Sequence, residues 1–119
     1  MVSTSIELTI RFNKLDGLIV LVCWGRIVYG AECERFVQTV LSALADSTFV
    51  AVDLSQTRAL DSAGVGSLAR LLTTARRNQK QLVIVAPSPR VQEVLRLTKM
   101  DTVFQVYRDA EEALRAIRS

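Results

Sequence analysis

The residues whose types and spacing could support chemistry lie near the middle of the 119-residue chain, around a serine that follows an aspartate. After a short loop that follows Asp-Leu-Ser at 53–55, the segment 61–64 reads Asp-Ser-Ala-Gly. A serine at a helix start can present its hydroxyl to a docked protein, and a phosphate there would meet free backbone N–H groups and the positive end of the helix dipole. Ser62 is therefore the candidate modification site. The plainer interpretation is that Ser62 only caps the helix.

Two aspartates are candidates for supporting roles. Asp61 could orient the acceptor hydroxyl or repel an added phosphate, and a turn aspartate that hydrogen-bonds its own backbone explains this residue equally well. Asp53 lies at the end of a predicted strand. We expect Asp53 and Ser55 to brace the loop that carries Ser62, and we do not expect direct contact with nucleotide or metal.

The composition argues against most catalytic chemistry. The sequence contains no histidine, which removes the usual general base, the usual partner of a Ser or Cys nucleophile and the commonest zinc ligand. The adjacent carboxylates Glu111 and Glu112 are better explained by capping of a helix start than by acid–base catalysis. We therefore expect no enzymatic turnover, no catalytic residue, no metal site and no cofactor.

The segment 64–69, Gly-Val-Gly-Ser-Leu-Ala, matches the glycine fingerprint of dinucleotide sites. A true fingerprint follows a strand directly and has an acidic residue about 20 positions later. Here we expect a loop between Leu54 and the glycines, and positions 84–86 are Ile-Val-Ala. Close packing at a helix start is the simpler role for Gly64 and Gly66.

Length and composition predict a single domain over residues 1–119. The chain is 50% hydrophobic, enough to fill one core without disulfides or metal. Its longest apolar run, Leu18–Trp24, is much shorter than the roughly 20 residues of a membrane-spanning helix, so no membrane insertion is expected. Residues 1–5 lack the features of a secretory signal and the two cysteines form no Cys-x-x-Cys pair, so a cytoplasmic location is expected. The net charge is +3, and most of the Lys and Arg residues are scattered among carboxylates, which predicts no nucleic-acid binding.

Hydrophobic periodicity predicts strands that alternate with helices. Asp16 and Gly17 form a tight-reversal signal, so the first two strands should be antiparallel, and Gly25 should end or kink the second. Ser88 should be the N-cap of a helix that begins at Pro89. A capping-box-like pair, Asp109 and Glu112, should open the last helix. The predicted strands are 6–12, 18–24, 49–54, 81–86 and 103–107, and the predicted helices contain 36–44, 65–72, 91–98 and 110–117.

This order of elements predicts an α/β fold. Strands that alternate with helices of this length imply right-handed crossovers and parallel pairing. The expected architecture is a mixed sheet with an antiparallel N-terminal hairpin, otherwise largely parallel, and about four helices packed over it.

A strand that ends in Asp-Leu-Ser, a loop, and Asp-Ser-x-Gly at a helix start closely resemble the STAS domain, and above all the bacterial anti-sigma factor antagonists. The likeness runs from about Ile6 to Ile117 and includes Gly-Arg-Ile at 25–27 and Ala-Pro-Ser-Pro at 86–89. It implies a partner that is both an anti-sigma factor and a serine kinase. The unphosphorylated chain would bind this partner and free the sigma factor, and phosphorylation of Ser62 would switch the chain off. The residues expected to contact the partner are Asp61, Ser62, Ala63 and Gly64.

The resemblance leads to one expectation about a substitution. Gly64→Val should harm partner docking more than folding, because bulk is added where close approach is expected.

Antagonists often carry an acidic residue just after the Gly-x-Ile turn, and here that position is Val28, followed by Tyr29 and Gly30. The alternative function keeps the fold and makes the chain a permanent subunit, either of a phospholipid-transport ABC complex or of a stress-signalling scaffold. Weak nucleotide hydrolysis is the enzymatic alternative, and a homodimer is a further option.

Overall fold

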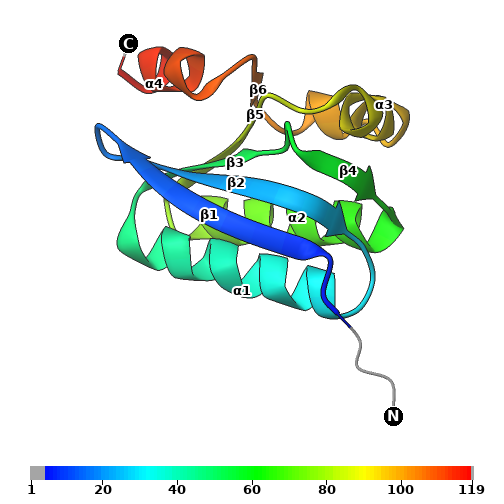
Figure 1. Ribbon diagram of the computed structural model, residues 1–119. Helices are drawn as coiled ribbons and strands as arrows, with labels where there is room; N and C mark the ends of the chain where they lie inside the picture. The colour runs from blue at the N-terminus through cyan, green and yellow to red at the C-terminus, as the bar shows by residue number, and fades with distance from the viewer. Residues whose placement is uncertain (1–4, 119) are drawn as a thin grey trace.

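Residues 5–118 are described by a computed structural model, in which helices cover both faces of a central sheet (Figure 1). The elements follow one another along the chain in the alternating order that periodicity predicts. Their bounds are β1 (Leu8–Leu15), β2 (Leu18–Ile27), α1 (Ala31–Asp46), β3 (Phe49–Asp53), β4 (Thr57–Leu60), α2 (Ser62–Arg77), β5 (Gln81–Val85), α3 (Pro89–Leu97), a 3-10 turn (Met100–Thr102), β6 (Val106–Tyr107) and α4 (Ala110–Arg118).

The sheet has the mixed topology that the sequence predicts. Its strand order is β1-β2-β3-β5-β6, with β4 paired to the end of β2. β1 and β2 are antiparallel, and every other pair is parallel. The reversal between β1 and β2 uses Asp16 and Gly17, both with positive φ (48° and 89°), as a two-residue hairpin requires. The predicted fold class is confirmed.

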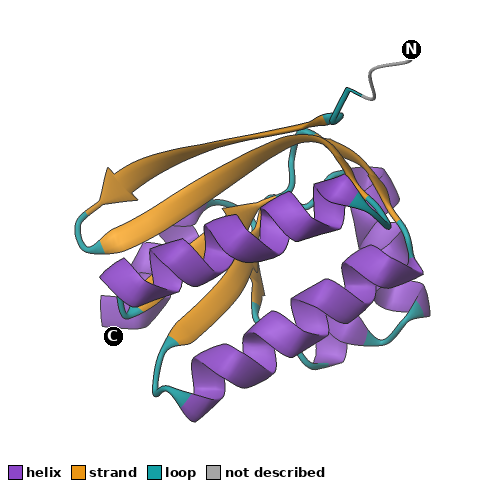
Figure 2. Cartoon of the chain, turned by 90° about the horizontal axis from the view of Figure 1, so that it is seen from below, coloured by secondary structure: helices purple, strands orange, loops and turns teal. Residues whose placement is uncertain are grey.

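Two apolar layers hold the helices to the sheet. The larger layer lies between the sheet and the pair α1 and α2, which run side by side across one face (Figure 2). Phe36, Leu68 and Ile84 are fully buried in this layer. The smaller layer lies under α4 on the opposite face, around Ala113 and Val83. Strand residues alternate between the two layers, because successive side chains of a strand point to opposite faces.

One strand was not predicted from the sequence. β4 lies where a loop was expected, and three of its four residues pair with β2 from Gly25 to Ile27. Four residues are too few to show the alternation by which strands are recognised, so periodicity could not find β4. The register shifts between Gly25 and Arg26, and Gly25 has a φ of 115°. Gly25 therefore kinks β2 and does not end it.

Most predicted helix starts agree with the structure. Ser88 is the N-cap of α3 and Pro89 is its first residue, as predicted. At α4 the Asp109 carboxylate accepts from the N–H of Glu112 at 2.8 Å, and the Glu112 carboxylate accepts from the N–H of Arg108 at 3.0 Å. The second bond falls one residue earlier than in a standard capping box, where Asp109 would be the donor. β6 is shorter than predicted, because the 3-10 turn precedes it and Phe104 is buried in the larger apolar layer.

Candidate functional site

Asp61 is the N-cap of α2, and its carboxylate joins two segments that are far apart in the sequence. One oxygen, Oδ1, accepts from the N–H of Gly64 at 2.9 Å. The other, Oδ2, accepts from the N–H of Tyr29 at 3.0 Å, in the loop between β2 and α1. Of the two roles weighed for Asp61, the structure therefore shows the backbone-bonding one. Ser62 is the first residue of α2, so the interpretation of Ser62 as the N-cap is wrong.

These bonds favour the ionised form of Asp61. Partial burial by itself would raise the pKa of this carboxyl, but the backbone N–H groups of Tyr29, Gly64 and Ala63 together outweigh that effect and hold the pKa below its ordinary value. The first-turn N–H groups thus already face a carboxylate. The expectation that free N–H groups would receive a phosphate on Ser62 is therefore wrong. Such a phosphate would lie outside these groups, beside the negative charge of Asp61.

Ser62 is exposed, and the next two residues are progressively more buried. Ala63 is half-buried, and its carbonyl accepts from the hydroxyl of the buried Ser67 at 2.9 Å. Because the hydroxyl of Ser67 is hydrogen-bonded within the helix, Ser62 carries the accessible hydroxyl of the first turns of α2. An exposed hydroxyl on an anchored helix start can be reached by a docked protein.

Gly64 is not on the surface, and this corrects the expectation that it faces a partner. A β-carbon at this position would collide with the backbone carbonyl of Ile27 and lie 2.6 Å from Cδ1 of Leu60. Gly64 is buried because α2 packs against the end of β2 at this point. The expectation that Gly64→Val harms docking more than folding is therefore wrong.

The expected loop between Leu54 and the glycines contains strand β4, so distance from a strand does not exclude a dinucleotide site. β4 ends at Leu60, just before Asp61, so a strand does precede the glycines closely. The glycines nevertheless lie inside the first turns of α2, where the N–H of Gly64 is bonded to Asp61 and the α-carbon is packed against Ile27. These contacts commit the first glycine of the fingerprint to the fold, so the N–H of Gly64 and the space beside it are not available to a pyrophosphate.

The loop before α1 is joined to the same helix start, and its Tyr29 is a residue to which the sequence assigned no role. Tyr29 is 83% exposed although its backbone is bonded to Asp61. On either side of it, Val28 and Gly30 accept from the N–H groups of Cys33 and Glu34, both at 3.1 Å. An aromatic residue beside glycine, between a buried strand and a helix, was the signal that could have marked this position. The ring is exposed, and the backbone that carries it is hydrogen-bonded to the helix start.

A solvent-exposed group of ion pairs and hydrogen bonds joins Glu7 to β2, β4 and α1 near the site. The Glu7 carboxylate pairs with Arg26 of β2 at 2.8 Å and with Arg58 of β4 at 3.1 Å. The hydrogen bond from Arg26, followed by the charge of Arg58, lowers the pKa of Glu7. The N–H of Glu7 also donates to the Glu32 carboxylate of α1 at 2.9 Å. Exposed pairs of this kind contribute little stability; they set the charge pattern beside the helix start.

The structure does not bring Asp53 and Ser55 to Ser62. The N–H of Ser55 donates to the Asp53 carboxylate at 2.9 Å, which braces the turn between β3 and β4. Ser62 follows the other end of β4, so these residues sit at opposite ends of that strand. Support of the Ser62 loop by Asp53 and Ser55 stays a prediction.

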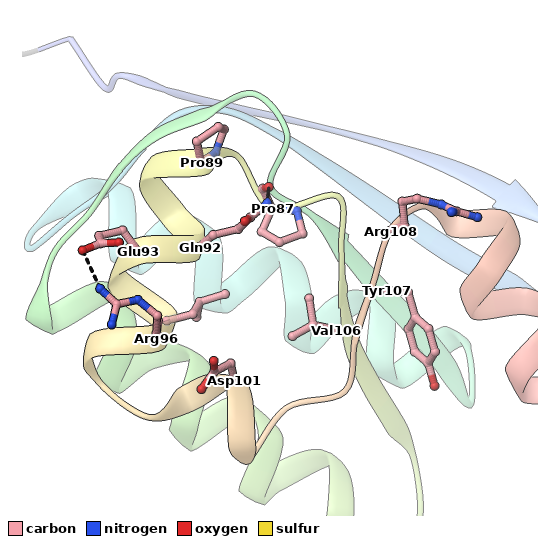
Figure 3. A pocket seen from close by; sticks show the side chains of 10 residues that line it. Pro87, Pro89, Gln92, Glu93, Arg96, Asp101, Val106, Tyr107 and Arg108 are labelled. Carbon is pink, nitrogen blue, oxygen red and sulfur yellow. Dashed lines mark hydrogen bonds and ion pairs between the residues drawn. The ribbon is translucent and has the colours of Figure 1, made fainter.

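A hollow in the surface is separate from the helix start. It has a volume of about 530 Å³ and lies between α3 and β6 (Figure 3). Two arginines that line it form ion pairs: Arg96 pairs with Glu93 at 2.8 Å, and Arg108 pairs with Glu112 of α4 at 3.5 Å. Over residues 5–118, no three His, Cys, Asp or Glu side chains are arranged to hold a metal ion, and no helix is long and apolar enough to cross a bilayer.

Comparison with known proteins agrees with this geometry. Residues 9–113 match the model of the STAS domain. The fold is similar to an anti-sigma factor antagonist from Mycobacterium paratuberculosis, with a TM-score of 0.84 and 26% identity over 94% of this chain and 95% of that one. It is also similar to an anti-sigma-factor antagonist (STAS) domain protein from Planctomyces limnophilus, with a TM-score of 0.78 and 25% identity over 92% and 98%.

A further similar structure is the Bacillus cell fate determinant SpoIIAA in its phosphorylated form. The TM-score is 0.68 and the identity 15%, over 92% of this chain and 99% of that one, a likeness that shows the fold alone. The family match covers most of the sequence and includes both α2 and the loop before α1. The chain belongs to the STAS domain family.

Proposed function

We propose that this chain is an anti-sigma factor antagonist that acts by binding and has no turnover of its own. In this role it binds an anti-sigma factor that is also a serine kinase. Phosphorylation of Ser62 ends the binding and returns the anti-sigma factor to its sigma factor. Such a protein regulates transcription and works in the cytoplasm.

One observation carries the proposal: Ser62 presents an exposed hydroxyl at the start of a helix whose N-cap is fixed from two sides. A kinase needs a reachable hydroxyl, and a docked partner needs a surface that does not rearrange. Support also comes from the antagonist of Mycobacterium paratuberculosis, which shares 26% of its residues with this chain.

The charge around Ser62 gives the switch its direction. A phosphate adds about −1.5 to −2 charge units at neutral pH, beside the ionised carboxylate of Asp61. An uncompensated charge at a docked interface costs roughly 2 to 5 kcal/mol. That corresponds to a loss of affinity of about 30-fold to several thousand-fold. The helix itself tolerates the charge, because negative groups are favourable at a helix start.

The first test is phosphorylation. The purified chain is incubated with ATP and, one at a time, with each anti-sigma factor of the serine-kinase class encoded in the same genome, and its intact mass is measured. We expect one kinase to add a single phosphate to the wild type and none to Ser62→Ala. If every such kinase leaves the wild type unmodified, the proposed switch is wrong.

The second test is binding of that kinase by calorimetry. Ser62→Ala should bind as tightly as the unphosphorylated wild type, and Ser62→Asp should bind at least about 30-fold more weakly. Ser42→Asp is the matched control, because it adds the same charge at an exposed position of α1. Equal affinity of all four proteins would favour a permanent subunit, the function to which Val28 at the usual acidic position also points.

A further inference from the structure

β1 lies at one edge of the sheet, and within the described chain its outer side has no neighbouring strand (Figure 1). The N–H of Arg26 donates to the carbonyl of Glu7 at 2.8 Å, just before β1 begins. In an antiparallel pair this bond directs the backbone N–H and C=O groups of the odd-numbered residues toward β2. The same groups of the even-numbered residues therefore point to the open edge.

The open stretch of this edge has a limit at each end. At one end the guanidinium of Arg35 in α1 donates to the carbonyl of Leu8 at 3.2 Å. At the other end the chain turns away at Asp16. Three residues between these limits direct N–H and C=O groups outward without a hydrogen-bond partner in residues 5–118: Ile10, Phe12 and Lys14. An unpaired edge of this kind is a template for pairing with another strand.

The side chain in the middle of the open stretch is apolar and exposed. Phe12 is 65% exposed and borders a hollow of about 430 Å³ between β1 and α1. Ile19 and Leu21 of β2 contribute to the lining of this hollow. Charged residues commonly protect edge strands from pairing, and here Arg11 and Lys14 flank an aromatic residue at the centre. The centre of the edge is therefore suited to a contact with another strand.

The occupant that fits this edge is a second copy of β1, because the open stretch is symmetric about Phe12. In an antiparallel pair centred on Phe12, Ile10 of each copy lies opposite Lys14 of the other, so all the open backbone groups are paired. Arg11 then lies opposite Asn13. A shift by two residues in either direction places Arg11 or Asn13 opposite its own copy and leaves an open residue opposite one of the two limits.

The helix beside β1 has charges that complement this arrangement. Arg35 lies at the Leu8 end of the strand, and Asp46 lines the hollow together with Lys14 at the other end. Within residues 5–118, neither Arg35 nor Asp46 is in an ion pair. Antiparallel pairing joins opposite ends, so Arg35 of each copy lies at the same end as Asp46 of the other. The remaining charges at these ends, Lys14 and Glu32, are also of opposite sign.

We infer that two copies of the chain associate through β1, in an antiparallel pair that is centred on Phe12 and joins the two sheets into one. This inference does not depend on the proposed function, because Ser62 belongs neither to β1 nor to the hollow beside it. The dimer carries two Ser62 sites, and both lie outside the paired edge.

The first test is the mass of the chain in solution, measured by sedimentation equilibrium over a dilution series. We expect the mass to rise to that of two chains below about 1 mM, with a Kd of about 100 μM or less, as for a small transient interface. Phe12→Lys should stay a monomer with a nearly unchanged Tm, because the exposed ring is replaced by two ammonium groups that face each other across the pair. Tyr29→Lys, the same kind of change at another exposed aromatic residue, is the control and should dimerise like wild type. A monomeric wild type, or a Phe12→Lys variant that dimerises normally, would overturn the inference.

The second test is charge reversal on α1. Asp46→Arg and Arg35→Asp should each weaken the dimer by about 5-fold or more, and the double variant should recover most of the loss, because opposite charges again face each other. Purely additive losses would contradict the antiparallel arrangement.

The third test is disulfide cross-linking, which reports the register. In the pair centred on Phe12, positions 11 and 13 of opposite copies form a non-hydrogen-bonded pair, whose β-carbons are close enough for a disulfide. Arg11→Cys and Asn13→Cys are each made in a Cys33→Ser background, because Cys33 is the cysteine that is not buried. We expect a cross-linked dimer when the two variants are mixed, and much less when either is oxidised alone. Preferential cross-linking of one variant with itself would contradict the register, and no cross-linking in any of the three samples would contradict the pairing.

Discussion

The inward and outward sides of α2 differ in what restricts their residues. On the inward side, Gly64 is fixed by the fold, because any side chain would enter the space of the Ile27 carbonyl. On the outward side, Ser62 and Gly66 are exposed, and within residues 5–118 a β-carbon added to Gly66 would meet no atom within 4 Å. The two glycines are two residues apart and look alike in the sequence. A short motif can therefore contain one glycine that the fold requires and one that it does not, and only the neighbours of each residue distinguish them.

The largest effect should come from the inward side. Gly64→Ala places a β-carbon against the backbone carbonyl of Ile27, which cannot move without displacing β2. We expect a loss of about 3 kcal/mol or more in the free energy of unfolding, measured by urea denaturation, and Gly64→Val should not fold. Near-wild-type stability of Gly64→Ala would remove the contrast between the two sides.

The N-cap between the two sides should have the next largest effect. Asp61→Ala removes the acceptors of two backbone N–H groups, those of Gly64 and Tyr29, and should lower the free energy of unfolding by about 2 kcal/mol. Asp61→Asn keeps one side-chain oxygen and should lose about half as much. Faster amide hydrogen exchange at Tyr29 in both variants would show that the cap also holds the loop, whereas unchanged exchange there would show that it does not.

The same carboxylate predicts a dependence on pH. Because the pKa of Asp61 is lower in the folded protein than its unfolded value of about 3.9, the stabilisation is fully present above that value. It is lost as the pH falls through the folded pKa. The difference in unfolding free energy between wild type and Asp61→Asn should therefore be constant above about pH 5 and shrink toward pH 2. Glu7, whose pKa is also lowered, contributes equally to both proteins. A difference that stays constant down to pH 2 would contradict this role.

The smallest effect on stability should come from the outward side. Ser62→Ala and Ser62→Asp should each change the free energy of unfolding by less than about 0.5 kcal/mol, because Asp61 and not Ser62 is the cap. Negative charge at a helix start is favourable, so Ser62→Asp should be the more stable of the two. Thermal denaturation measures both. A loss of 1 kcal/mol or more in Ser62→Ala would show that the hydroxyl has a structural role and would weaken the comparison.

Much of the fold was predictable because it depends on local signals. Asp16 and Gly17 predict the hairpin, and Ser88 with Pro89 predicts the start of α3, because turn and capping geometry depend on a few adjacent residues. Alternation and helical spacing predict the other helices and the other strands except β4. The site was predicted only in part. The sequence pointed to Ser62 and Asp61, but it placed Gly64 on the surface and gave no role to Tyr29.

The sequence by itself determined the order of the elements, the mixed sheet and the serine that opens α2. The tertiary structure decided the rest: that β4 is a strand, that Asp61 bonds a residue 32 positions away, and that Gly64 is enclosed while Gly66 is open. The physical reason is the range of the interactions. Turns, caps and amphipathic faces are encoded within a few residues, whereas a close approach between α2 and the end of β2 exists only after the sheet has formed.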